Sequence, residues 1–298
     1  MKKNYILFIA LIILVVLNLI LSRTGGELVV VKGILIIGIL AIAGIFVFSN
    51  FIENKKEKKG KKMRQEIIEK LKELQDLKYR DFNKPLIPNV EEDKIIGVRL
   101  PVLRKIAREI VKTDGLGYFC EIVNTPVEEL YYEEKMLAGM TIGYAKLDIK
   151  QWCNLMDRYV PFIDNWAVCD SVCSSMKTIV NNHQKEIWDY MQKYLEDNRE
   201  FHIRFGVVMA MDYFVNDKYI DKFLEKLKTV KTTDYYAMMA VAWAISVVFV
   251  KYEEKAMELI KSNSLDIATH NKAIQKIRES NRVEKDKKIL ITKFKRKV

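Results

Sequence analysis

Apolar residues recur every three or four positions along most of this chain, and no stretch alternates apolar and polar residues for long enough to form a strand. All five prolines lie between Pro85 and Pro161, so long runs are free of helix breakers. The pattern predicts an almost wholly helical, all-α protein. Helices are expected at 64–77, 98–112, 126–146, 148–158, 166–178, 183–196, 199–215, 218–229, 233–250, 252–261, 266–280 and 284–295.

Short helices that follow one another in antiparallel pairs are typical of an α-solenoid of the HEAT type, with a repeat of roughly 40 residues. One spacing supports this fold class independently. Trp166, Arg204 and Trp243 are separated by 38 and 39 residues, so in such a repeat they would occupy equivalent positions on successive helix pairs. The sequence therefore predicts that these three side chains line one concave surface.

Two long uncharged runs precede the predicted repeat. Asn4 to Ser22 and Gly33 to Phe51 are almost entirely apolar, and each is long enough to cross a bilayer as a helix. A signal peptide is the alternative for the first run, but the run is too long and no small-residue cleavage site follows it. We expect a two-span transmembrane hairpin over residues 1–52, a polybasic linker over 53–62 and the helical domain over 63–298.

Lysines on the flanks of the two runs indicate the orientation of the hairpin. Lys2 and Lys3 precede the first run, and the cluster KKEKKGKK, Lys55 to Lys62, follows the second. Between the runs, the only cations are Arg23 and Lys32. Both termini and the helical domain are therefore expected at the cytoplasmic side of the cell membrane, with the lysine cluster contacting anionic lipid headgroups.

The net charge of +11 is unevenly distributed. Residues 1–62 carry 10 Lys/Arg and 3 Asp/Glu (+7), residues 63–270 carry 29 and 33 (−4), and residues 271–298 carry 11 and 3 (+8). The basic C-terminal segment is a candidate phosphate contact, and a solvated last helix explains its charge equally well.

The cysteines and histidines form no metal-binding pattern. Cys169 and Cys173 are spaced C-x3-C, and none of the three histidines lies within four residues of a cysteine. We expect small buried thiols in a reducing compartment. No disulfide, metal site or cofactor is expected.

Two charged residues interrupt apolar helical stripes. In FIDNWAVCDSVCSSM, Phe162 to Met176, Trp166 and Asp170 are four residues apart and share a helix face. Arg204 also falls in an apolar stripe, where an unpaired guanidinium is costly. Either Asp170 and Arg204 form a salt bridge with each other, or both face a cleft for a charged ligand. Core packing is the simpler explanation for each tryptophan, above all for Trp243 in the apolar run YYAMMAVAWAISVVFV.

Six segments from Met63 onward, taken together and in this order, resemble the AlkD family of DNA alkylation repair glycosylases, which are HEAT-like repeats. They are IGVRLPVLRKIARE, YYEEKMLAGMTIGYAK, FIDNWAVCDSVCSSMK, FHIRFGVVMAM, YYAMMAVAWAIS and HNKAIQKIRES. The resemblance covers about four fifths of the chain. The N-terminal hairpin is foreign to this family, and Ala167 stands where a second aromatic residue often follows the first tryptophan.

The resemblance implies a role for each residue of the set. Asp170 would be the catalytic carboxylate, Trp166 and Trp243 would flank the damaged nucleotide, and Arg204 would hold the DNA backbone. The implied substrates are cationic N-alkylated purines in double-stranded DNA, such as 3-methyladenine and 7-methylguanine, released without flipping the base into a pocket. Further phosphate contacts are expected from four cations of the basic C-terminal segment, namely Lys272, Lys276, Arg278 and Arg282.

The leading hypothesis is therefore a DNA glycosylase tethered to the membrane. The alternatives are a non-catalytic DNA-structure-binding member of the same family and a membrane-anchored helical scaffold for a protein partner. The combination of Trp166, Asp170, Arg204 and Trp243 favours catalysis, because a scaffold has no need to keep these four side chains on one face.

Overall fold

The computed structural model describes residues 10, 12–16, 19 and 29–297, and these residues form helices and no strands. The expected all-α class is confirmed. The chain divides into two compact units, Met1–Met63 and Arg64–Val298.

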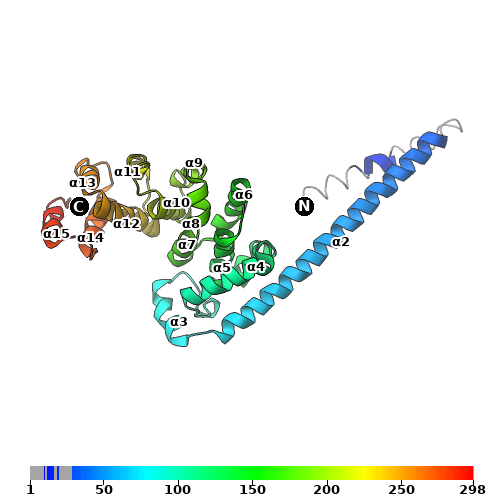
Figure 1. Ribbon diagram of the computed structural model, residues 1–298, viewed down its shortest axis with the longest axis horizontal. Helices are drawn as coiled ribbons and strands as arrows, with labels where there is room; N and C mark the ends of the chain where they lie inside the picture. The colour runs from blue at the N-terminus through cyan, green and yellow to red at the C-terminus, as the bar shows by residue number, and fades with distance from the viewer. Residues whose placement is uncertain (1–9, 11, 17–18, 20–28, 298) are drawn as a thin grey trace. The chain divides into compact units, whose positions relative to one another are not determined.

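Helix α2 (Val29–Glu73) begins in the first unit (Figure 1). Its stretch from Ile36 onward is long and apolar enough, by length and composition, to cross a membrane, and most of its large apolar side chains are exposed. It is the single helix of this kind among the described residues, where the sequence predicts two. Most of the expected first span, Asn4 to Ser22, lies outside the described residues.

The polybasic segment 53–62, predicted as a linker, is helical, because α2 runs through it without a break. Lysine and glutamate favour helix, and the segment contains no proline. Glu57 and Lys61 also form an ion pair one turn apart, at 2.7 Å. The lysine cluster is thus carried on a helix.

In the second unit, helices alternate between two rows (Figure 1), here named the front row and the back row. The front row contains α5 (Tyr132–Tyr144), α7 (Trp166–Cys173), α10 (Glu200–Tyr213), α12 (Tyr235–Lys251) and α14 (Ile267–Glu279), each packed on the next. The back row contains α6 (Ile149–Tyr159), α9 (Gln184–Leu195), α11 (Ile220–Thr229) and α13 (Glu253–Lys261). The other helices are α3 (Leu77–Asn83), α4 (Leu100–Asn124), α8 (Lys177–Asn182) and α15 (Lys285–Thr292).

Helix α4 consists of two segments joined at Asp114, whose φ of −160° and ψ of 66° are not helical. The Asp114 carboxylate accepts a hydrogen bond from the backbone N–H three residues later and so caps the second segment. Arg104 of the first segment donates to Ser174 at the end of α7, and Asn124 of the second accepts from Arg158 of α6. The first segment therefore continues the front row, and the second continues the back row.

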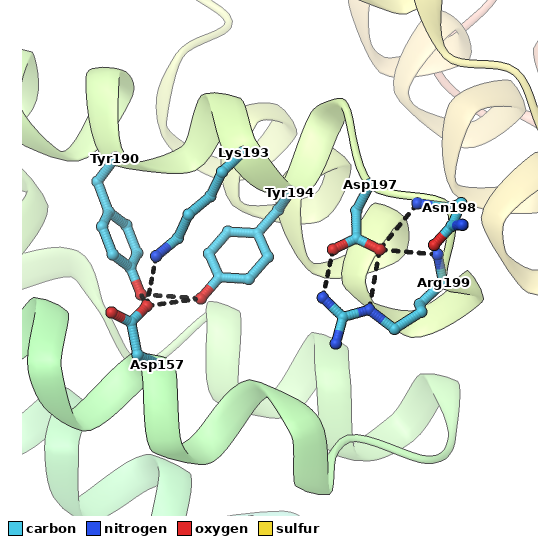
Figure 2. A network of polar contacts seen from close by, with 7 residues as sticks. All are labelled: Asp157, Tyr190, Lys193, Tyr194, Asp197, Asn198 and Arg199. Carbon is cyan, nitrogen blue, oxygen red and sulfur yellow. Dashed lines mark hydrogen bonds and ion pairs between the residues drawn. The ribbon is translucent and has the colours of Figure 1, made fainter.

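Contacts between neighbouring helices of a row recur at a near-constant separation in sequence. In the back row, the Asp157 carboxylate of α6 accepts hydrogen bonds from Tyr190 (2.7 Å) and Tyr194 (3.2 Å) of α9 and forms an ion pair with Lys193 (Figure 2). Lys193 follows Asp157 by 36 residues. In the front row, the Tyr213 hydroxyl donates to a backbone carbonyl 40 residues earlier. These separations are those of a helical repeat with a period near 40 residues.

Helix α5 begins later than the sequence predicts. Pro126 is followed by a single 3-10 turn, and the α-helix starts six residues after it, because the chain is extended at Leu130 to bury that side chain. Near the start of α5, the buried carboxylate of Glu133 accepts hydrogen bonds from three successive backbone N–H groups at residues 96–98. This contact fixes the chain ahead of α4, where Gly97 has a φ of 95° that favours glycine.

Candidate functional site

A cleft of about 1100 Å³ lies on the front row of the second unit. Trp166, Asp170, Arg204 and Trp243 all line it. These side chains come from α7, α10 and α12, three successive helices of the row. The structure therefore brings together the four residues that the repeat spacing and the family resemblance selected.

Asp170 and Arg204 form a two-point ion pair inside this cleft. Arg204 Nε donates to Asp170 Oδ1 at 3.0 Å, and Nη2 donates to Oδ2 at 2.8 Å. The third contact of the guanidinium is to the backbone carbonyl of Tyr236, at 2.9 Å. Arg204 is only 5% exposed. The two interpretations left open by the sequence therefore both describe the pair: it is a salt bridge, and it faces a cleft.

The surroundings of the pair act on its protonation in opposite directions. Burial raises the pKa of the Asp170 carboxyl above its ordinary value, and the charge and hydrogen bonds of Arg204 oppose that shift. For Arg204, burial alone would lower the pKa, but Asp170 outweighs it and the pKa is raised. Two parallel N–H···O contacts are the geometry of an ionised carboxylate with a guanidinium. Arg204 thus holds the Asp170 carboxylate in a fixed orientation.

Trp166 is positioned by its backbone neighbours and by a segment that precedes α4. The buried Asn165 caps α7 by accepting a hydrogen bond from the N–H of Val168 at 3.0 Å, which makes Trp166 the first residue of the helix. The indole N–H of Trp166 donates to the carbonyl of Leu86 at 2.7 Å. Leu86 thus fixes the orientation of the indole ring.

The segment that carries Leu86 forms one wall of the cleft through Pro85, Leu86 and Pro88. Asn89 anchors this segment by donating to the backbone carbonyl of Asp164, whose carboxylate also pairs with Lys135. The sequence analysis did not predict this wall, since it expects no helix between residues 77 and 98. The one available signal is the pair of prolines three residues apart, which stiffens the backbone and disfavours a continuous α-helix there.

Trp243 is not packed in the core, which was the simpler explanation from the sequence. Its side chain is 36% exposed and faces the cleft, although α12 is apolar on every side. Apolar residues of α12 also line the cleft at Met239, Val247 and Val250. An apolar cleft wall and a core face have the same composition, so hydropathy could not distinguish them.

The four C-terminal cations predicted to contact phosphates do not lie together. Lys276 and Arg282 line the cleft. Arg278 lines a separate groove of about 490 Å³ beside α14 and α15. Lys272 lines neither and donates to Gln275 at 3.1 Å. Glu279 also lines the cleft and forms an ion pair with Lys276 at 3.0 Å. This end of the cleft thus has two cations and one acid.

A further acid, Asp212, lies two helical turns beyond Arg204 on α10. Partial desolvation by the surrounding protein and the negative charge of Asp170 raise the pKa of Asp212 to about 7, although part of the residue remains accessible to water. Cys169 and Cys173 are buried and form no disulfide, and no group of side chains in the described part of the chain is arranged to hold a metal ion.

The cleft thus combines an acid–arginine ion pair with two tryptophans, on three successive helices of the front row. The chain matches the family described as DNA alkylation repair enzyme over residues 53–277, about three quarters of its length. This protein belongs to that family. No curated protein and no solved structure matches it. The matched range contains the ion pair and both tryptophans and leaves out residues 278–298.

Proposed function

We propose that this protein is a DNA glycosylase that excises cationic N-alkylated purines, such as 3-methyladenine and 7-methylguanine, from duplex DNA. The observation that carries the proposal is the Asp170 carboxylate, oriented by Arg204 in a cleft between Trp166 and Trp243. Membership of a DNA alkylation repair family supports the substrate class.

The chemistry needs little more than this arrangement. A purine alkylated at N3 or N7 already carries positive charge and leaves readily. As its glycosidic bond breaks, positive charge develops on the sugar as an oxocarbenium ion. A fixed carboxylate such as Asp170 stabilises that charge, and more strongly where water is excluded. The same carboxylate can orient the attacking water, and the indole faces contribute about 0.5–2 kcal/mol each toward a cation.

Arg204 has two parts in this mechanism. It keeps Asp170 ionised despite burial, and it holds both carboxylate oxygens in place. Three of its five N–H groups are used by Asp170 and Tyr236, so two remain for a DNA phosphate. Lys276 and Arg282 would contact DNA phosphates at the cleft, and Lys272 and Arg278 would contact phosphates beside it.

The two-row arrangement supports a HEAT-like repeat, and its front row would accept the duplex. A cleft that is open to a duplex would allow excision without flipping the base into a deep pocket. The apolar part of α2 supports attachment to the membrane, with the cluster at residues 55–62 at the lipid headgroups and the repair domain on the cytoplasmic side.

The ion pair also favours a second candidate, a non-catalytic DNA-structure-binding protein of the same family. A carboxylate neutralised by a bidentate guanidinium is what a purely structural ion pair looks like. Incubation of the full-length protein with methylated duplex DNA, followed by analysis of released bases, separates the two. Release of 3-methyladenine or 7-methylguanine supports the glycosylase, and tight binding without release supports the second candidate.

A further inference from the structure

The last helix, α15, exposes two adjacent large apolar side chains. Ile289 is 66% exposed and Leu290 is 46% exposed, whereas the next residue, Ile291, is buried where α15 packs on α14. Single exposed apolar residues are normal on a protein surface. The pair therefore has to be judged by the side chains around it.

Cations surround this apolar pair. Residues 285–297 carry seven Lys/Arg and one Asp/Glu, a net charge of +6. Lys285, Ile289 and Lys293 follow one another at intervals of four residues, so they share one face of the helix. Among the described residues, Lys287 is the one cation of the seven that forms an ion pair with a carboxylate. The surface thus combines exposed apolar area with positive charge that is mostly not neutralised.

A groove of about 490 Å³ adjoins the apolar pair, between α14 and α15. Lys288, Ile289 and Lys295 line its α15 side. On the α14 side, Glu279 lines the groove but is already paired with Lys276 at 3.0 Å. Two ammonium groups can donate hydrogen bonds to an anion, and the isoleucine beside them offers an apolar contact. The groove therefore suits a ligand that is anionic at one end and apolar at the other.

The segment that follows α15 is bonded to the rest of the second unit. His270 of α14 is hydrogen-bonded through Nε2 to the carbonyl of Phe294 at 2.8 Å. Asn271 exchanges two hydrogen bonds with the backbone of Arg296, at 2.8 and 2.9 Å, and Arg296 Nη2 donates to the carbonyl of Leu265 at 2.6 Å. A surface that is held in place loses less conformational freedom on binding than a disordered basic tail does.

We propose that α15 and residues 293–297 dock on a bilayer surface that contains anionic phospholipids, with Ile289 and Leu290 at the boundary between headgroups and acyl chains. Lysines attract anionic headgroups, and apolar side chains among them are typical of helices that lie on a membrane. A DNA backbone would engage the lysines but would leave both apolar side chains in water, so the combination favours lipid.

This docking surface goes beyond the repair domain and needs no catalysis. Residues 285–297 lie outside the range matched by the DNA alkylation repair family, which ends at residue 277. The proposal rests on the proposed function only for the attachment through α2, which would keep a bilayer close to the domain and raise its effective concentration. Docking would then give the domain a second contact with the same membrane.

The test is lysine footprinting of the full-length protein in lipid nanodiscs, with an amine-reactive reagent and mass spectrometry. The discs contain phosphatidylcholine alone or phosphatidylcholine mixed with phosphatidylserine. Lys285, Lys293 and Lys295, all exposed, should react more slowly in the anionic discs, because docking covers them. High salt should restore part of their reactivity. Equal reactivity in the two kinds of disc would overturn the proposal.

Two variants separate the apolar contact from the charge. Ile289→Ser, Leu290→Ser keeps every charge and should lower the ratio of docked to free protein about ten-fold or more, because the apolar burial is lost. Lys288→Gln removes one charge and should lower the ratio about five-fold. If the first variant protected its lysines as well as the parent protein, the effect would be long-range attraction alone and the docking surface would be wrong.

Leu116→Ser and Lys150→Gln are the matched controls. Leu116 lies on α4 and is 46% exposed, as Leu290 is, and Lys150 is exposed on α6. Neither change should alter the protection of the α15 lysines. Melting temperatures in detergent show that each variant is folded. The Ile289→Ser, Leu290→Ser protein should also keep the parent's affinity for duplex DNA, because neither side chain lines the cleft.

The outcomes separate the docking surface from the proposed function. If the protein releases alkylated bases but its α15 lysines stay reactive in anionic discs, the docking surface is wrong and the glycosylase stands. If the protein binds anionic vesicles through Ile289 and Leu290 but does not integrate into phosphatidylcholine vesicles, the surface stands and the attachment through α2 is wrong. Binding to neither kind of vesicle overturns both. Protection of these lysines by duplex DNA and not by anionic lipid would identify a DNA contact and overturn the proposal.

Discussion

Both carboxylate oxygens of Asp170 accept hydrogen bonds from the guanidinium of Arg204, at 3.0 and 2.8 Å. The two residues are 34 positions apart and belong to neighbouring helices of the front row. Since Arg204 is buried, removal of either partner leaves the other without its counter-charge, which typically costs 3–5 kcal/mol of stability. Experiments on this site therefore need variants of both residues.

Arg204 should set the pH below which excision fails. Its charge and hydrogen bonds lower the pKa of Asp170 against the raising effect of burial. Removal of that opposing effect in Arg204→Ala raises the Asp170 pKa further. Because only the ionised carboxylate stabilises the oxocarbenium ion, the acidic limb of the rate profile should move to higher pH. Single-turnover excision across a pH series measures the shift.

Arg204→Lys is the control for that profile, because it keeps a positive charge beside Asp170. Its acidic limb should stay close to that of the parent protein. An Arg204→Ala protein with the parent's limb would show that Arg204 does not govern the ionisation of Asp170.

The hydrogen bond from Trp166 to Leu86 should make phenylalanine a poor substitute. Trp166→Phe keeps an aromatic face but loses the indole N–H that bonds the Leu86 carbonyl. A net loss of about 1 kcal/mol in positioning would slow excision about five-fold. Trp243 makes no such hydrogen bond among the described residues, so Trp243→Phe should cost less. Equal effects of the two changes on single-turnover rates would argue against this role of Leu86.

Asp212 should make stability depend on pH. Its pKa in the folded protein is about 7, against roughly 3.9 for an unfolded aspartate. Between these values the folded state binds more protons at this group, so its contribution to stability falls as pH rises. Asp212→Asn should therefore unfold at a higher temperature than the parent protein near pH 8, and at a similar temperature near pH 4. A difference in melting temperature that is the same at both pH values would refute the assignment.

The orientation of the chain is tested with reporters. If both apolar runs cross the membrane, a reporter fused after Val298 should behave as cytoplasmic and one inserted at Gly25 as external, because lysine-rich flanks favour the cytoplasmic side. If protease added outside intact cells removed the C-terminal domain, both the topology and access to DNA would be contradicted.

Periodicity made much of the fold predictable. The apolar repeat located most helices of the second unit, though not α3 or the second segment of α4. The spacing of Trp166, Arg204 and Trp243 predicted one shared surface, and all three line one cleft. This works because residues one repeat apart occupy equivalent positions in a stacked array.

What escaped prediction depends on contacts between distant segments. The wall at Pro85, Leu86 and Pro88 belongs to no helix pair, and its place beside Trp166 depends on a hydrogen bond across 80 residues. The exposure of Trp243 could not be read from a helix that is apolar on all sides. The second segment of α4, after Asp114, was not predicted, and it starts at a side-chain cap that a helical pattern does not reveal.

The central claim is that Asp170 acts in catalysis, and the structure shows why Asp170→Asn alone is an ambiguous test. Asparagine preserves the volume but leaves the buried guanidinium of Arg204 without a counter-charge. The double variant Asp170→Asn, Arg204→Gln replaces both charges by amides of similar shape and should recover stability relative to the single change. Arg204→Gln alone completes the cycle.

The most direct measurement is single-turnover release of 7-methylguanine by these three variants, at equal concentrations of folded, DNA-binding protein. We predict that both variants carrying Asp170→Asn are slower than the parent by about 10²-fold or more, the size of effect seen when one preorganised electrostatic group is lost. Arg204→Gln alone should be less impaired at a pH where Asp170 is ionised. A folded double variant that releases 7-methylguanine as fast as its parent would contradict the catalytic role of Asp170.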